Sequence, residues 1–201
     1  MKNILYIGSK SASRKKLLQE AGIPFEILEQ QADEAKCDWN LPLQQLVESI
    51  AHYKMEHVVL PVGKNEGHII LVLTADTLSV DPMGKIRGKP VNAVDAYEML
   101  KAAGMGENIC GTAFCLEKKV YGNGTWQTQE KIMRYAQAKY EFKIRDSLIE
   151  DYLKYSGAME AAGAIKIEDG KQFVKSINGS YSAIIGLPMY ELREALIQIG
   201  L

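Results

Sequence analysis

Short apolar runs alternate with stretches of helical spacing along the first half of the chain. Apolar runs at 4–7, 25–28 and 69–73 predict strands, and the third is continuous enough for a strand buried on both faces. Apolar residues at helical spacing, with Gly or Pro near the ends, predict helices over 12–21, 43–60, 92–103, 146–155 and 188–199. The pattern is therefore typical of an α/β protein.

The pattern changes near residue 108. Residues 108–143 predict two or three strands, and Tyr121-Gly122-Asn123-Gly124 predicts the hairpin turn between them, because Asn-Gly adopts the positive φ angles of a tight turn. A further strand is expected over 173–177, before the closing helix that begins at Pro188. The later part of the chain is therefore expected to contain an antiparallel section.

Length and composition narrow the class of protein. With 201 residues, of which 47% are hydrophobic, the chain can form one substantial core or two lobes that share a sheet. The formal net charge of −1 argues against a nucleic-acid partner and favours a small anionic ligand bound by local cations. No apolar window approaches the length of a membrane span, so no membrane partner is expected.

Cysteine usage points to a reducing compartment. Cys37, Cys110 and Cys115 are odd in number and lack the paired spacing of a zinc site or a disulfide framework. The first apolar run is also too short for a signal peptide. These observations predict reduced thiols and a cytoplasmic location.

The stretch from Gly8 to Lys16 joins the first strand to the first helix. A helix N-terminus offers unpaired N–H groups, the hydroxyls of Ser9 and Ser11 can donate, and Arg14 can fork onto a phosphate. The ordinary alternative is an N-cap serine followed by a solvated basic face. The motif alone leaves both interpretations open.

Asp76 follows the buried run 69–73 and is expected just past the carboxyl end of that strand. Ligands of open α/β sheets gather at this edge, where a carboxylate can hold Mg²⁺ or draw a proton from an attacking water. The alternative is an aspartate that caps the following turn. Lys54, on the second helix, and Lys89, in Gly88-Lys89-Pro90, are taken singly more often solvated surface lysines.

Several segments taken together resemble the Maf family of nucleoside triphosphate pyrophosphatases. The matching pieces are Ser9-x-Ser11 ahead of Arg14, the run from Leu73 to Val80, Gly88-Lys89-Pro90, and Gly179-Ser180-Tyr181-Ser182 continuing into Gly186-Leu187-Pro188. Their order covers the chain from the first strand to the last helix. The resemblance implies one domain over residues 1–201, with an elongated mixed sheet flanked by helices and two lobes around a central cleft, as in inosine triphosphate pyrophosphatase.

The resemblance also implies an activity and a site. The reaction is hydrolysis between the α and β phosphorus of a modified or non-standard nucleoside triphosphate, with Asp76 as the proton acceptor. Asp33-Glu34 matches an acidic pair of the family, and Glu34 with Asp76 would hold Mg²⁺ or Mn²⁺. The residues implied to bind the triphosphate are Ser9, Ser11, Arg14, Lys54 and Lys89.

The positions that would select the base give a mixed signal. Ser13 stands where many members carry a large residue, and Glu168 stands where pyrimidine-preferring members carry glutamine. A carboxylate can accept from two adjacent donors of guanine, so Glu168 favours a guanine-type triphosphate such as 7-methyl-GTP. Thr77 is instead the residue of the pyrimidine-preferring members, which keeps a dTTP/UTP pyrophosphatase as the alternative.

Other classes remain open at this stage. A non-catalytic nucleotide-binding regulator of cell division would use the same residues without turnover. A homodimer is the candidate assembly. A phosphatase or kinase is a weaker alternative, since the chain has no Gly-x-x-x-x-Gly-Lys-Ser/Thr loop. The product distinguishes these classes: a pyrophosphatase releases pyrophosphate, a regulator releases no product, and the third class releases orthophosphate.

Overall fold

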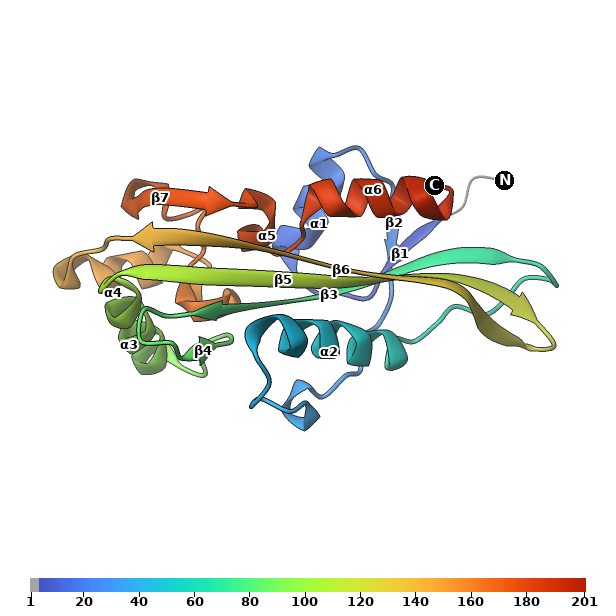
Figure 1. Cartoon of the computed structure of the whole chain (residues 1–201), viewed down its shortest axis with the longest axis horizontal. Coiled ribbons are helices and arrows are strands. Elements are labelled where there is room, and N and C mark those ends of the chain that lie inside the picture. Colours follow the sequence, from blue (N-terminus) through green and yellow to red (C-terminus); the bar gives the residue numbers. More distant parts are fainter. Residues whose placement is uncertain (1–3) are drawn as a thin grey trace. The chain divides into compact units, whose positions relative to one another are not determined.

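A computed structural model describes residues 4–201 of the chain (Figure 1). Its strands form one seven-stranded sheet in the order β2-β1-β3-β5-β6-β7, with β4 paired to β3. The strands are β1 (Leu5–Ile7), β2 (Phe25–Ile27), β3 (Ile69–Val80), β4 (Ile86–Arg87), β5 (Glu107–Gly122), β6 (Thr125–Phe142) and β7 (Val174–Gly179). Because β1 pairs in parallel with β2 and β3 while β6 and β7 are antiparallel, the sheet is mixed.

Helices accompany the sheet throughout the described chain. The α-helices are α1 (Ala12–Glu20), α2 (Leu43–Glu56), α3 (Ala93–Ala103), α4 (Asp146–Tyr155), α5 (Tyr181–Ile185) and α6 (Met189–Ile199). One-turn 3-10 helices are η1 (Glu34–Lys36), η2 (Ala158–Glu160), η3 (Ala162–Ala164) and η4 (Lys171–Phe173). The predicted α/β class with a mixed sheet and flanking helices is therefore confirmed.

Two element boundaries differ from the sequence prediction by more than two residues. The second helix ends at Glu56 rather than at residue 60, because the next residues pair with the segment after β2: Val59 N–H donates to Glu29 O and Gln31 N–H to His57 O. The strand expected over 69–73 runs on to Val80. Its length depends on neighbouring strands, which a local apolar run does not reveal.

The antiparallel section consists of two long strands, β5 and β6, joined by a two-residue turn. Asn123 and Gly124 both have positive φ angles, 54° and 76°. Such angles match the twist of a tight hairpin turn and are the reason that Asn-Gly is favoured there. The hairpin predicted at this place is therefore confirmed.

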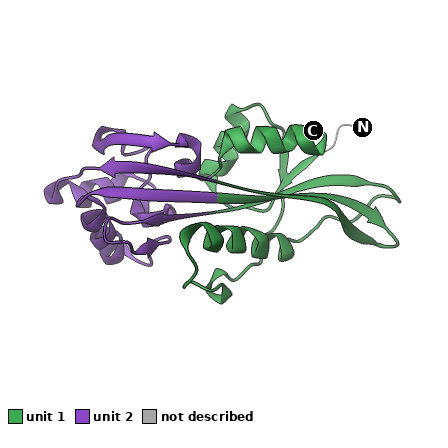
Figure 2. Cartoon of the chain, viewed as in Figure 1, with its two compact units in different colours: residues 1–76, 113–135, 187–201 green, residues 77–112, 136–186 purple. Residues whose placement is uncertain are grey.

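The chain divides into two compact units, each assembled from separate segments (Figure 2). Unit 1 comprises the described residues up to Asp76 together with Ala113–Tyr135 and Leu187–Leu201, and unit 2 comprises Thr77–Thr112 and Ala136–Gly186. Strands β3, β5 and β6 each contribute residues to both units. Neither unit is therefore a continuous piece of chain.

Unit 1 has a hydrophobic core on each face of its part of the sheet. Leu71 and Leu73 of β3 pack with Leu18 of α1 and with α6. Ile70 and Val72, which alternate with them, point to the other face and pack with α2. Figure 1 shows α1 and α6 on one side of these strands and α2 on the other.

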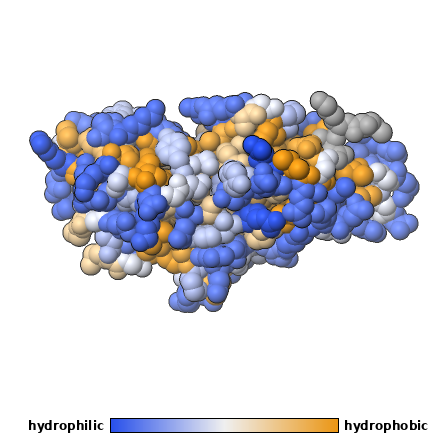
Figure 3. Space-filling model, turned by 45° about the horizontal axis from the view of Figure 1, so that its top comes forward, coloured by the Kyte–Doolittle hydropathy of each residue, from blue (hydrophilic) through white to orange (hydrophobic). Residues whose placement is uncertain are grey.

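Unit 2 has a core of its own, formed by α3, α4 and the ends of β5 and β6. Phe142 and Tyr152 are completely buried in it, and their ring centroids lie 5.6 Å apart. Hydrophilic residues cover most of the face of the molecule in Figure 3, with apolar groups scattered among them. Within residues 4–201, no helix combines the length and apolar content that a membrane crossing requires.

Candidate functional site

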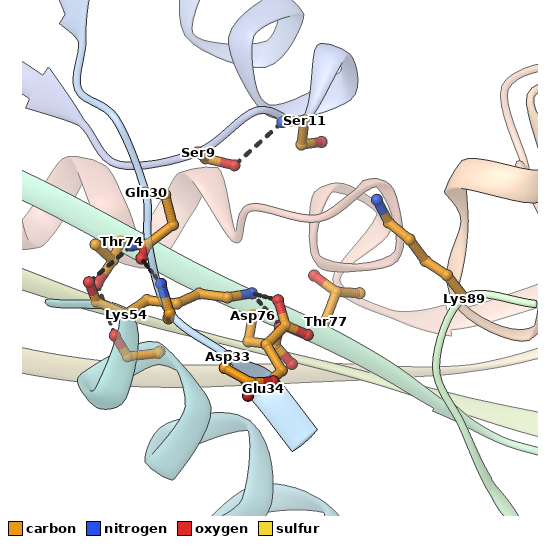
Figure 4. Close-up of polar contacts among 12 residues, drawn as sticks. Ser9, Ser11, Gln30, Asp33, Glu34, Lys54, Thr74, Asp76, Thr77 and Lys89 are labelled. Atoms are coloured by element: carbon orange, nitrogen blue, oxygen red, sulfur yellow. Dashed lines mark hydrogen bonds and ion pairs between the residues drawn. The ribbon is translucent and has the colours of Figure 1, made fainter. Parts of the chain in front are cut away.

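A charged cluster in unit 1 is built around Lys54 (Figure 4). Its Nζ atom lies 2.6 Å from Oδ1 of Asp76 and 2.7 Å from Oε1 of Glu34. Lys54 and Asp76 are buried, whereas 45% of the Glu34 side chain is exposed. One ammonium between two carboxylates leaves a net negative charge, which suits a further cation better than a further anion.

The three charged side chains come from different elements. Lys54 lies in the last turn of α2, Asp76 on β3 and Glu34 at the start of η1. The hydroxyl of Thr74, also on β3, donates to the carbonyl of Ala51 on α2 at 2.7 Å. This bond fastens the strand to the helix close to the Lys54–Asp76 pair.

Asp76 occupies a different place from the one expected. It lies inside β3, four residues before the end of the strand, and not just past its carboxyl end. The parallel pairing with β1 does end early, at Leu73 opposite Ile7. Asp76 thus lies beyond the end of its parallel neighbour while its own strand continues.

The two oxygens of Asp76 have different surroundings. Oδ1 accepts the hydrogen bond from Lys54, whereas Oδ2 is buried and has no hydrogen-bond partner among residues 4–201. A buried polar atom left without a partner costs about 1–3 kcal/mol. Oδ2 is therefore the atom of this cluster best placed to accept a bond from a ligand, a water or a metal ion.

The donor set fits a hard divalent cation with few protein ligands. Within the described chain, no group of three or more His, Cys, Asp or Glu side chains is arranged to hold a metal. Mg²⁺ is commonly bound by one or two carboxylates, with phosphate oxygens and water completing its shell. The pair of Glu34 and Asp76, with one orphaned carboxylate oxygen, meets that requirement.

Asp33, the other member of the acidic pair, has a structural task. Its Oδ1 accepts from the backbone N–H of Ala35 at 3.3 Å and caps η1. Lys36 lies 4.0 Å from its other oxygen. Of the two neighbouring acids, only Glu34 contacts Lys54.

Cys37 lies beside the same cluster and was not singled out as a site residue by the sequence. Burial raises the pKa of its thiol, and the carboxylates of Asp76 and Glu34 raise it further, while Lys54 acts in the opposite direction. The thiol is therefore neutral at physiological pH. In the sequence, the feature that could have indicated its place near the site is its position three residues after Glu34.

The serine and arginine residues at the start of α1 are also brought together. The Ser9 hydroxyl accepts from Nη1 of Arg14 at 3.2 Å and from the N–H of Ser11 at 3.3 Å. Ser11 is the N-cap of α1, as expected if this stretch were an N-cap serine followed by a solvated basic face. Arg14, however, is buried rather than solvated.

Lys89 belongs to unit 2 and forms a surface ion pair. Its Nζ lies 2.7 Å from Oε2 of Glu160, and both side chains are exposed. Exposed pairs of this kind contribute little to stability, so Glu160 can be displaced from Lys89 at small cost.

The candidate base-selecting residues lie on separate elements. Ser13 is on α1, and Glu168 is half-buried in the irregular segment between η3 and η4. Thr77 Oγ1 lies 2.8 Å from Thr112 Oγ1, and Thr112 donates to the carbonyl of Ala183 at 2.6 Å. Because a hydroxyl has one proton, Thr77 is the donor to Thr112.

Comparison with known proteins gives consistent matches over the whole chain. A family model described as Maf-like protein matches residues 4–199. The dTTP/UTP pyrophosphatase of Hydrogenovibrio crunogenus is 32% identical over 200 residues, which cover 98% of this chain and 96% of the relative. The dTTP/UTP pyrophosphatase of Treponema denticola is 35% identical over 201 residues, with 96% and 95% covered. That of Ruminiclostridium cellulolyticum is 31% identical over 205 residues, with 100% and 97% covered.

Proposed function

We propose, because this chain belongs to the Maf family, that it is a nucleoside triphosphate pyrophosphatase and that its substrates are dTTP and UTP. It hydrolyses the bond between the α-phosphorus and the oxygen that bridges to the β-phosphorus, releasing the nucleoside monophosphate and pyrophosphate. The relatives carry the name dTTP/UTP pyrophosphatase, which supports the pyrimidine substrates. A cytoplasmic location and a homodimer stay predictions.

The single observation that carries the mechanism is the asymmetry of the Asp76 carboxylate. Lys54 donates a hydrogen bond to Oδ1, while Oδ2 is buried without a partner among residues 4–201. In the proposed reaction, water attacks the α-phosphorus and gives its proton to the Asp76 carboxylate, and the bridging oxygen leaves with the pyrophosphate. Lys54 holds the carboxylate in one orientation during this transfer.

The remaining residues bind and orient the triphosphate. Arg14 and the serine hydroxyls at the start of α1 would neutralise and position phosphate oxygens, and Lys89 would exchange Glu160 for a phosphate. A divalent cation held by Asp76 and Glu34 would supply additional positive charge at the phosphates.

The guanine-type preference expected from Glu168 is not supported by the relatives, whose name specifies dTTP and UTP. Thr77 agrees with the pyrimidine alternative. A non-catalytic regulator is the second class, but it gives no reason for a buried carboxylate oxygen to stay unpartnered beside a lysine. The enzyme interpretation accounts for that feature directly.

Product analysis tests the proposed function. The protein is incubated with Mg²⁺ or Mn²⁺ and, separately, UTP, dTTP, GTP and 7-methyl-GTP, and pyrophosphate and orthophosphate are quantified. We expect pyrophosphate and the monophosphate, with the highest kcat/KM for UTP and dTTP. Release of orthophosphate alone, or no turnover of any triphosphate, would contradict the proposal, and a higher kcat/KM for 7-methyl-GTP would restore the role of Glu168 as a guanine reader.

A further inference from the structure

Glu34 reaches Lys54 from a segment with little structure of its own. It begins η1, a single 3-10 turn, and it is the exposed member of the Lys54 cluster. Lys54 and Asp76, by contrast, are buried on α2 and β3. A one-turn helix has too few internal hydrogen bonds to fix a side chain, so other contacts must hold Glu34 in place.

The side chain of Gln30 supplies two such contacts. Its Nε2 donates to the carbonyl oxygen of Lys54 at 2.7 Å, and its Oε1 accepts from the backbone N–H of Ala32 at 2.7 Å. A carbonyl can only accept and an N–H can only donate, so these partners fix the orientation of the amide. Figure 4 shows the side chain of Gln30 extending from the segment that leads to Glu34 towards Lys54 on α2.

Backbone contacts reinforce this attachment on the N-terminal side of Glu34. Gln30 forms an isolated antiparallel bridge with Val58, and the N–H of Gln31 donates to His57 O at 3.1 Å. The side chain of Gln30 thus ties the loop to the same residue whose ammonium contacts Glu34 and Asp76. Beyond Ala32, apart from the ion pair of Glu34 with Lys54, the loop has local hydrogen bonds: Asp33 caps η1, and Trp39 donates to Glu34 O at 3.2 Å.

We propose that Gln30 is a positioning residue that holds the Glu34 carboxylate next to Asp76 and thereby sets the affinity of the site for a divalent cation. This inference rests on the proposed function, in which Glu34 and Asp76 share the cation. Asp76 keeps its position without Gln30, because β3 is fastened to α2 through Thr74 and Ala51. Loss of the Gln30 amide therefore affects Glu34 selectively.

Gln30→Met tests the proposal, because methionine keeps the length of the side chain and removes both hydrogen bonds. Binding of Mn²⁺ alone is measured on the nucleotide-free protein by the electron paramagnetic resonance signal of free Mn²⁺. We expect the Mn²⁺ dissociation constant to rise by roughly tenfold, as is typical when the support of a metal ligand is removed.

Gln31→Met is the matched control, because Gln31 is exposed and its amide, within residues 4–201, donates to the side chain of Glu29 and not to α2. Thermal melts establish that each variant is folded at the temperature of the titration. Wild-type Mn²⁺ affinity in Gln30→Met, or an equal loss in Gln31→Met, would overturn the proposal, because a general loosening of the loop would then explain the effect.

Glu34→Gln separates this proposal from the proposed function. If Glu34→Gln weakens Mn²⁺ binding and Gln30→Met does not, the positioning role fails and the metal role of Glu34 stands. If Glu34→Gln leaves Mn²⁺ binding unchanged, Glu34 is not a ligand, and the inference about Gln30 falls with it. Turnover of UTP, measured separately, tests the activity itself.

Discussion

At the scale of single residues, the most informative feature is the set of contacts of Lys54. Its ammonium contacts the carboxylates of Glu34 and Asp76, and in Asp76 it contacts Oδ1 and not Oδ2. Lys54 is held in the last turn of α2, and burial makes its charge–charge contacts stronger than they would be in water. The contact occupies Oδ1 and leaves Oδ2 to accept a proton or a ligand. The role proposed for Asp76 therefore depends on its unpartnered oxygen, Oδ2.

Asp76→Asn should abolish most of the turnover while the protein stays folded. The amide keeps the size of the side chain but cannot act as a general base, so kcat should fall by roughly 10²-fold or more. Steady-state kinetics with UTP measure the effect, and the thermal melt monitors folding. Asp151→Asn, which removes an exposed acid paired with Lys154, is the control for lost charge. A kcat close to that of the wild type would exclude Asp76 from the mechanism.

At the scale of elements, a buried ion pair on β5 is linked to β6 near the hairpin through the hydroxyl of Thr128. Lys119 Nζ lies 2.6 Å from Oε2 of Glu117, and the hydroxyl of Thr128 on β6 donates to the same oxygen at 2.8 Å. Burial by itself raises the pKa of Glu117, but the bonds from Lys119 and Thr128 and the charge of Lys119 outweigh it and lower the pKa. This carboxylate is therefore ionised at neutral pH.

Removing this charge should destabilise the protein in a pH-dependent way. Glu117→Gln leaves the Lys119 ammonium buried without its counter-charge, and breaking a buried pair costs about 3–5 kcal/mol. Because the folded pKa is lowered, the stabilisation by Glu117 is present above the unfolded pKa of about 4.3 and is lost as pH falls through the lower folded value. Urea unfolding should show a large difference between the variant and the wild type at pH 7, shrinking below about pH 4. A difference that stayed constant with pH would show that the charge of Glu117 does not stabilise the fold.

At the scale of the whole molecule, the chain passes repeatedly between the two compact units. The boundaries fall within β3, β5 and β6 and between Gly186 and Leu187. Each unit therefore depends on segments that are distant in the sequence. Cooperative folding of the complete chain is the expected consequence.

Equilibrium unfolding in urea should accordingly be a single transition. The two tryptophans, Trp39 and Trp126, both lie in unit 1, so their fluorescence follows that unit, whereas far-UV circular dichroism follows helices and strands of both. We expect the same midpoint from the two signals, because no unit is a continuous segment that could stay folded alone. Two separate midpoints would contradict this expectation.

The sequence by itself determined most of the elements and the residue types of the site. Helical spacing located α1, α3, α4 and α6 to within about a residue, because an amphipathic helix is encoded locally in its own apolar positions. Asn123-Gly124 located the hairpin for a similar reason, since positive φ angles are a property of these residues. The resemblance to the Maf family identified three residues of the candidate site: Asp76, Lys54 and Glu34.

The tertiary structure decided what these residues do to one another. The length of β3 depends on the strands beside it, which is why Asp76 lies inside the strand and not beyond its end. Contacts between Glu34, Lys54 and Asp76 join residues 20 or more positions apart, and the role of Gln30 depends on a carbonyl 24 residues away. Local patterns carry no information about such separations, because they are set by how α2, β3 and the loop before η1 pack together.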